Sequence, residues 1–209
     1  MTSIADQLIL GADRFLRTLS LEPTASRQSP ASGEELPVLN EQERLHAAGL
    51  MRINHTGEVC AQALYEGQAA TARDSEVRET LLKAASEEED HLAWCSDRLV
   101  ELESKPSVLN PAFYVASYLM GVVTGVMGDR ISLGFVAATE EQVCKHLEVH
   151  MTKLPAADTR SLKVIQQMHA DEQRHGNQAL DAGGASFPAA IKGIMAAMSK
   201  VMTSTTYRV

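Results

Sequence analysis

The stretch EEEDHLAWCSDRL, residues 87–99, decides how this chain folds. Within it, Glu88, His91 and Cys95 follow one another at intervals of three and four residues, the spacing of side chains that share one face of a helix. The neighbouring positions on that face are apolar: Leu81, Ala84, Leu99 and Leu102. The pattern therefore predicts a helix whose core-facing side contains a carboxylate and an imidazole.

The same arrangement occurs again in DEQRHG, residues 171–176. Glu172 and His175 are three residues apart, so both project from one face of a helix. The rest of this face is apolar as well: Ile165, Met168 and Ala179. One Glu-x-x-His pair is a weak sign of a metal site, but two pairs on core-facing stripes indicate a shared one.

A third helix places a single acid on its apolar face. Glu140 follows Leu133 and Val136 at helical spacing, whereas its neighbour Glu141 falls on the polar side beside Lys145. The periodicity therefore predicts that Glu140 points into the core and that Glu141 points to solvent.

The first helix of the set contributes Glu58, which shares a face with Met51, Asn54, Ala61 and Tyr65. The first single acid precedes the first Glu-x-x-His pair by 30 residues, and the second precedes the second pair by 32. Two helical hairpins of nearly equal length thus present the same groups in the same order, which indicates an internal repeat.

Six side chains are therefore expected to meet in the core: Glu58, Glu88, His91, Glu140, Glu172 and His175. Burying four carboxylates without compensation would be very costly, because isolated charges lose their hydration inside a protein. Two divalent iron or manganese ions would balance the four negative charges, and mixed oxygen and nitrogen ligands suit these metals. This ligand set is that of dinuclear four-helix bundles, so we expect an all-α, ferritin-like four-helix bundle.

The composition excludes several other classes of protein. A formal net charge of -8 argues against a generally basic nucleic-acid binder. The three cysteines (Cys60, Cys95 and Cys144) form no Cys-x-x-Cys pair and are odd in number, so neither a disulfide scaffold nor a cysteine-rich zinc site is expected. This cysteine usage is typical of a reducing compartment.

The chain divides into two parts by composition. Residues 1–38 are expected to form an N-terminal amphipathic helix and, from residue 20, a flexible linker rich in Ser, Pro and Ala. Residues 39–209 would form the bundle domain, which begins at the N-cap Asn40 with Glu43 three residues later. Its four long helices are predicted at residues 40–72, 75–104, 129–153 and 158–182.

Two more segments are suited to a membrane surface. Residues 111–129 are apolar, but their uncharged part is too short for a comfortable span, and three glycines weaken it as a helix. Residues 188–202 place apolar side chains on one face, with Lys192 and Lys200 able to extend toward water. Both are predicted as additional membrane-associating helices, the alternative being packing within the protein or between subunits.

Other polar residues near the six are candidates for supporting roles. Asp171 would accept a hydrogen bond from a ligand histidine, and Glu87 holds the equivalent place in the other hairpin. The alternative for Glu87, together with Glu89 and Asp90, is a solvated acidic face. The remaining candidates for contacts with the ligands are Tyr65 and His146, the latter as a possible proton relay.

Four stretches of the sequence resemble the demethoxyubiquinone hydroxylases of ubiquinone biosynthesis. They are RINHTGEVCAQALYEGQ (52–68), EEEDHLAWC (87–95), ATEEQV (138–143) and DEQRHG (171–176). The resemblance covers residues 40–209 approximately, and the Asn-His-Thr-Gly-Glu run ending at Glu58 is its most specific part. Many members have Tyr after the residue that matches His146, whereas this chain has Leu147.

The resemblance implies a function and a set of partners. The six core residues would hold two iron ions per chain, and the reaction would be O2-dependent hydroxylation of a polyprenyl methoxy-methyl-benzoquinol, demethoxyubiquinol. The enzyme would lie on the cytoplasmic face of the bacterial inner membrane, with a homo-oligomer and contacts to other enzymes of ubiquinone biosynthesis as further expectations. Two other classes fit the metal ligands alone, namely a ferritin-like ferroxidase or iron-storage protein and a di-manganese redox protein.

Overall fold

The computed structural model describes residues 4–19 and 23–209, and every regular element in these ranges is an α-helix. The elements are α1 (Ile4–Thr18), α2 (Glu41–Thr71), α3 (Ser75–Glu101), α4 (Asn110–Val126), α5 (Asp129–Lys153), α6 (Thr159–Asp181) and α7 (Ala189–Thr206).

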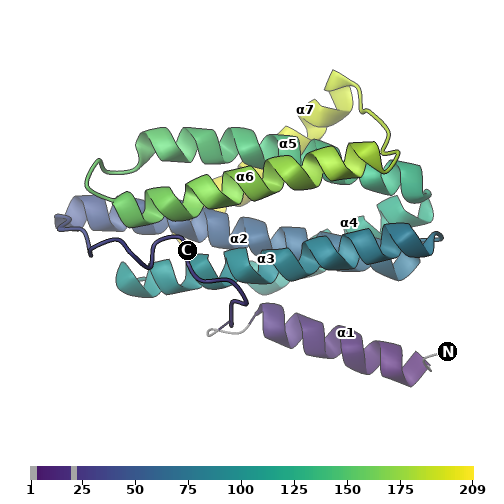
Figure 1. The fold of residues 1–209 in the computed structure, drawn as a ribbon, viewed down its shortest axis with the longest axis horizontal. Coiled ribbons are helices and arrows are strands. Elements are labelled where there is room, and N and C mark those ends of the chain that lie inside the picture. Colours follow the sequence, from purple (N-terminus) through teal and green to yellow (C-terminus); the bar gives the residue numbers. More distant parts are fainter. Residues whose placement is uncertain (1–3, 20–22) are drawn as a thin grey trace.

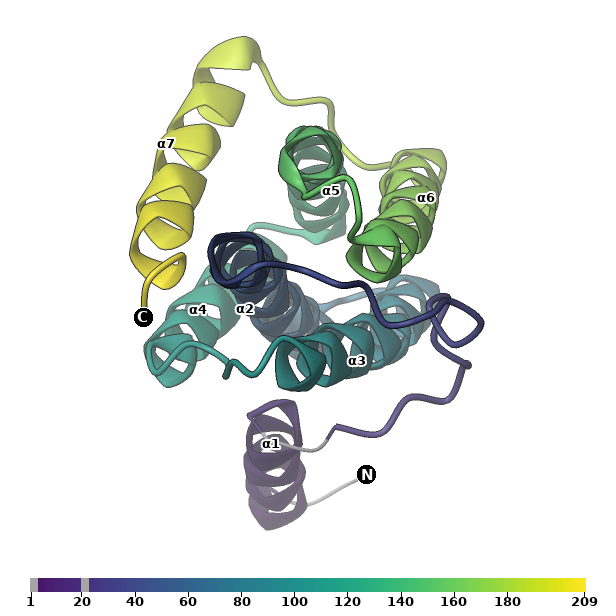
Figure 2. The ribbon, with the colours of Figure 1, turned by 90° about the vertical axis from the view of Figure 1, so that its left-hand side faces the viewer.

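Four long helices form the bundle (Figure 1). Helices α2 and α3 make one hairpin, α5 and α6 make the other, and the two hairpins pack against each other through α2 with α5 and α3 with α6. Helix α4 lies along α2, and α7 crosses the outside of α2 and α5 (Figure 2). The predicted all-α four-helix bundle is confirmed, and the predicted bounds of its four long helices differ from the observed ones by no more than three residues.

The start of α2 shows how the sequence sets these bounds. The Asn40 side chain accepts a hydrogen bond from the backbone N–H of Glu43, and the Glu43 carboxylate accepts one from the N–H of Asn40. This reciprocal pair satisfies two N–H groups that have no partner within the helix. The predicted N-cap is therefore confirmed.

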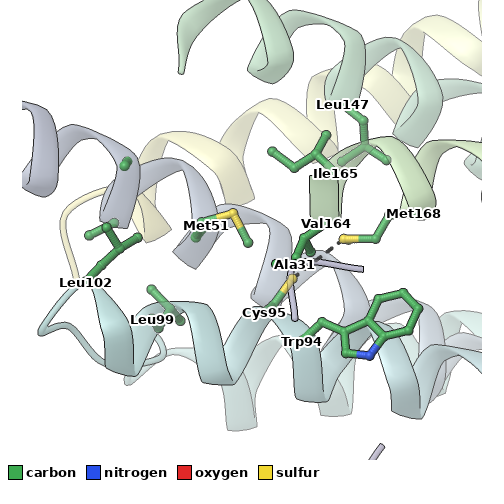
Figure 3. Close-up of a cluster of buried hydrophobic side chains, with 12 residues drawn as sticks. Ala31, Met51, Trp94, Cys95, Leu99, Leu102, Leu147, Val164, Ile165 and Met168 are labelled. Carbon is green, nitrogen blue, oxygen red and sulfur yellow. Dashed lines mark hydrogen bonds between the residues drawn. The ribbon is translucent and has the colours of Figure 1, made fainter. Parts of the chain in front are cut away.

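Two apolar clusters fill the bundle and leave a polar layer between them. One cluster joins α2, α3, α5 and α6 with Ala31 from the preceding segment (Figure 3). The second surrounds Tyr65 and includes Leu81 and Leu133. On each of the four helices, the predicted acids and histidines fall between the residues of the first cluster and those of the second, so the bundle holds them at mid-height.

Helix α4 owes its position to glycine. A Cβ added to Gly67 of α2 would lie 2.3 Å from the Tyr118 carbonyl oxygen, and one added to Gly121 would lie 2.3 Å from the Leu64 carbonyl oxygen. These glycines therefore let the two backbones come into direct contact. Two of the three glycines in residues 111–129, Gly121 and Gly125, were expected to weaken a helix but instead serve the packing of α4 on α2.

The outer sides of α4 and α7 are apolar. Val115, Leu119 and Val123 are half or more exposed on α4, as are Met198 and Val201 on α7. Both helices lie on the same side of the bundle (Figure 2). Across residues 4–19 and 23–209, no helix is long and apolar enough to cross a membrane.

One detail of the predicted α7 is wrong. Lys192 was expected to extend toward water beside a membrane, but its ammonium group forms an ion pair with Glu141 of α5. The pair ties the start of α7 to the bundle, so this lysine serves packing.

The segment before α2 also differs from expectation. Residues 20–38 were expected to be a flexible linker, but the part from residue 23 onward is packed along α3 and α6 (Figure 2). Ala31 is only 2% exposed within the apolar cluster, and the Glu34 carbonyl accepts a hydrogen bond from Arg160 of α6. Residues 20–22 lie outside the described residues. We refer to residues 23–39 as the strap.

Candidate metal centre

All six residues predicted to meet in the core do so. None is more than 3% exposed: Glu58, Glu88, His91, Glu140, Glu172 and His175. Ligand atoms of four of them lie within 4.8 Å of one another: Glu58, Glu88, His91 and Glu172. Each of the four bundle helices contributes at least one side chain, so the centre depends on the whole bundle.

Glu88 and Glu172 connect the two histidines. One oxygen of Glu88 lies 2.9 Å from His91 Nδ1, and the other lies 3.2 Å from His175 Nδ1. Glu172 repeats this arrangement, with 3.0 Å to His91 Nδ1 and 3.3 Å to His175 Nδ1. A carboxylate that presents one oxygen to each of two sites is placed to bridge two metal ions.

The other two glutamates lie toward opposite ends of this arrangement. Glu58 Oε2 is 3.5 Å from His91 Nδ1. Glu140 accepts a 2.6 Å hydrogen bond from the Tyr65 hydroxyl. The predicted contact of Tyr65 with this set is thus present.

The Nε2 atom of each histidine, on the side of the ring away from the inner glutamates, contacts a further carboxylate. His91 Nε2 lies 3.0 Å from Asp171 Oδ2, and His175 Nε2 lies 2.9 Å from Glu87 Oε2. An ionised carboxylate can only accept, so Nε2 donates in both rings and Nδ1 faces the inner glutamates. Carboxylates that fix the tautomer and orientation of a histidine in this way are a recurrent feature of metal sites.

The protein atoms alone leave the centre incompletely satisfied. Four buried oxygens of the inner glutamates make no well-aligned hydrogen bond, although three of them lie within 3.5 Å of a histidine Nδ1: Glu58 Oε2, Glu88 Oε1, Glu140 Oε2 and Glu172 Oε1. Buried polar atoms are normally paired, and these four oxygens belong to four acids that surround one small volume. Oxygen and nitrogen donors that include four negatively charged carboxylates are well suited to two divalent cations.

The pKa values of these buried groups are also those expected of a centre that binds cations. Burial, together with the charges of Glu172 and Glu88, raises the pKa of Glu140 well above its usual value. Burial likewise raises the pKa of Glu58, with the charges of Glu88 and Glu172 adding to it. Burial alone would lower the pKa of His175, but its hydrogen bonds to Glu172 and Glu88 raise it to about 11. Metal ions would take over the role that protons have here.

Comparison with known proteins agrees with this geometry. The sequence model of the family described as ubiquinone biosynthesis protein COQ7 matches residues 45–206. The chain belongs to this family. It is 58% identical to the 3-demethoxyubiquinol 3-hydroxylase of Chromohalobacter salexigens, over 98% of this chain and 97% of the relative. Two further relatives share that description: one from Ectopseudomonas mendocina, 56% identical over 99% of this chain and 97% of its own, and one from Marinomonas sp., 55% identical over the full length of both.

The Asn-His-Thr-Gly-Glu run, the most specific part of the resemblance to the family, connects α2 to its neighbouring helices. Asn54 binds His150 Nδ1 at 2.7 Å, and Thr56 donates to the Asn110 side chain at 2.8 Å. The run thus ties α2 to α5 and to α4 in the turn that precedes Glu58. Burial lowers the pKa of His55 to about 4, so this histidine is neutral and belongs to helix packing.

His146 is placed differently from the six. Its ring lies edge-on to that of His150, with 4.0 Å between ring centroids, and its buried Nε2 has no hydrogen-bond partner in the described part of the chain. A role for His146 in proton transfer stays a prediction.

The sequence did not predict the contacts of three residues near the centre of this COQ7-family chain. Arg174 donates 2.8 Å hydrogen bonds to both Glu87 and Asp171, and its position in the DEQRHG motif, three residues after Asp171, is a usable signal. Asp90 was expected on a solvated acidic face, which is wrong: it is 2% exposed. The reason is Arg27 of the strap, whose Nε lies 2.5 Å from Asp90 Oδ2. No pattern in the sequence near Arg27 predicts its contact with Asp90.

Proposed function

We propose that this chain is a 3-demethoxyubiquinol 3-hydroxylase, an O2-dependent monooxygenase of ubiquinone biosynthesis. The observation that carries the proposal is the conjunction of full-length relatives of that description with a buried centre of four glutamates and two histidines. The relatives supply the substrate, demethoxyubiquinol, and the centre supplies a place where O2 chemistry can occur away from water.

The six inner residues would hold two iron ions per chain, and Glu88 and Glu172 each present one oxygen toward each histidine. Iron bound there would supply the O2 activation that hydroxylation of the unsubstituted ring carbon requires. The chain itself supplies orientation and protection: Asp171 and Glu87 fix the two imidazoles, and the Tyr65 hydroxyl fixes Glu140. Burial raises the pKa of Tyr65 well above its usual value, so the hydroxyl keeps its proton and acts as a donor.

The quinol carries a polyprenyl tail, so the enzyme must work at a lipid surface. We assign this surface to the apolar outer sides of α4 and α7, which lie on the same side of the bundle (Figure 2). Exposed apolar area of this kind marks interaction sites on soluble proteins. Peripheral binding to the cytoplasmic face of the inner membrane follows as part of the proposal, with a homo-oligomer through the same surface as the alternative.

A double variant tests the lipid surface. Ile194 and Met198 are 64% and 55% exposed on α7, and replacing both by Glu should lower co-sedimentation with anionic liposomes at least ~tenfold, because charge in the interface is costly. The control is Gln166→Glu with Asn177→Glu, which adds the same charge at exposed positions of α6 and should leave sedimentation unchanged. Unchanged sedimentation of the α7 variant, with loss of self-association, would assign the surface to a subunit interface instead.

Quinone profiling of bacteria tests the reaction. Cells that lack this chain should lose ubiquinone and accumulate demethoxyubiquinone, and plasmid-borne wild-type chain should restore the normal profile. Normal ubiquinone in the deletion strain, without another hydroxylase for that ring position, would refute the proposal. Accumulation of an earlier precursor would move the hydroxylation to a different ring carbon.

The same cells separate the two other classes. A ferroxidase or iron-storage protein would change iron content and leave the quinone profile untouched. A di-manganese redox protein would be purified with manganese, and its loss would leave ubiquinone at the wild-type level.

A further inference from the structure

The strap reaches the metal centre from outside the bundle. Its residues precede position 45, where the match to the family begins, and α3 and α6 are the helices that it covers (Figure 2). Its most buried apolar side chain is Ala31, which lies within the core cluster beside Trp94 and Val164, and Ala25 and Leu39 pack against the same cluster (Figure 3). The strap is thus a built part of the fold next to both Glu-x-x-His helices.

Arg27 is the residue through which the strap touches the centre. Its Nε donates to Asp90 at 2.5 Å, and its Nη1 donates to Asp171 Oδ2 at 2.9 Å. The same Asp171 oxygen accepts the hydrogen bond from His91 Nε2 at 3.0 Å. A fork-shaped guanidinium can hold two carboxylates at fixed positions, which an ammonium group cannot do.

Further contacts fix the Arg27 guanidinium in place. It lies over the Trp94 ring, 4.8 Å from the ring centroid, and the Trp94 indole N–H donates to the Arg27 carbonyl at 3.3 Å. The backbone N–H of Ser26 donates to Asp90 Oδ1 at 2.6 Å. The Trp94 ring in turn lies 5.4 Å from the His91 ring, centroid to centroid.

We propose that Arg27 is a positioning residue of the metal centre, and that the strap completes the site on the His91 side. The proposal rests on the metal site proposed above. Arg27 holds the Asp171 carboxylate and Asp171 holds the His91 ring, in an orientation in which Nδ1 of His91 would bind a metal ion.

The two halves of the centre are supported in different ways. On the His175 side, the carboxylate behind the ring is Glu87, and its partner is Arg174 of α6, within the bundle. On the His91 side, Asp171 also receives Arg174, but its oxygen next to His91 is held by Arg27 of the strap. Loss of Arg27 should therefore weaken one metal position more than the other.

An Arg27→Gln variant tests this asymmetry. Both the wild-type and the variant chain are loaded anaerobically with ferrous iron, and release to a coloured chelator is followed with time. In the variant, one iron per chain should be released ~10–100-fold faster, the effect typical of losing a partner behind a metal ligand, while the other keeps its wild-type rate.

Trp94 supplies a second readout that does not depend on activity. It is the only tryptophan of the chain, so its fluorescence reports this place alone. Arg27→Gln should make Trp94 more accessible to acrylamide and should weaken the quenching that ferrous iron causes. Arg27→Lys should fall between wild type and Arg27→Gln, because it keeps the charge but not the fork.

Arg17→Gln is the matched control. Arg17 of α1 pairs with Glu89 of α3 at 3.6 Å, and both side chains are exposed. Its iron release and Trp94 quenching should equal those of the wild type. If Arg27→Gln lowers only the melting temperature of the metal-free chain and releases both irons at wild-type rates, Arg27 merely fastens the strap and the proposal is overturned. Failure of the wild-type chain to bind iron would instead refute the metal site itself.

Discussion

A Glu140→Ala variant is expected to lose at least ~100-fold in hydroxylation rate, whereas Glu141→Ala should keep most of its activity. The two residues are adjacent and chemically identical, so the comparison isolates their orientation. Glu140 is 1% exposed among the inner glutamates and accepts the Tyr65 hydrogen bond. Glu141 faces outward and pairs with Lys145 at 2.6 Å and with Lys192 of α7.

The reason for the large effect is that Glu140 has no substitute. Its removal takes away one carboxylate of the set and leaves the buried Tyr65 hydroxyl without its acceptor. Turnover is measured with a short-chain demethoxyubiquinol in detergent, so that membrane binding plays no part. Iron content is measured on the same samples, and it should fall only in Glu140→Ala. Equal losses in both variants would mean that α5 presents a different face to the centre.

The orientation of these helices was predictable because buried charge is rare. A carboxylate or an imidazole in an otherwise apolar stripe shows which way a helix faces, and six such residues in a repeated order indicate the orientation of four helices at once. The capping residue Asn40 added the start of the first one. Local pattern and tertiary arrangement agree at all of these positions, which is the condition under which sequence reasoning works well.

The strap was not predictable for the opposite reason. Its contacts join residues far apart in the chain, such as Arg27 with Asp171, 144 positions away, and its Ser- and Pro-rich composition is also that of unstructured linkers. The misassignment of Asp90 follows directly, because an acid at a polar position is expected in water until a cation from elsewhere covers it. Likewise, the role of the α4 glycines could not be predicted, because it depends on their close contact with α2.

Removal of the metal is expected to cause the second large effect. Ligand binding to the folded state alone adds about 4 kcal/mol when the ligand is at a thousand times its dissociation constant. For a chain of this size, each kcal/mol raises the melting temperature by about 2–4 °C. Ferrous iron should therefore raise the melting temperature of the metal-free chain by ~10 °C or more, measured anaerobically by circular dichroism.

The Glu140→Gln variant should separate the stability of the metal-free chain from the stability gained by binding iron. A carboxyl group whose pKa is raised in the folded state destabilises that state increasingly as pH rises from its unfolded pKa toward its folded one. The pKa of Glu140 is raised by burial and by Glu172 and Glu88, so at neutral pH the metal-free wild type is destabilised by it, and Gln removes this effect while keeping an acceptor for Tyr65. The metal-free variant should then melt at the same temperature as the wild type or a few degrees higher, yet gain much less from iron. Glu141→Gln should behave as wild type in both states, since Glu141 is outside the centre. A variant that melts lower without metal and gains as much from iron would identify Glu140 as a packing residue and remove it from the ligand set.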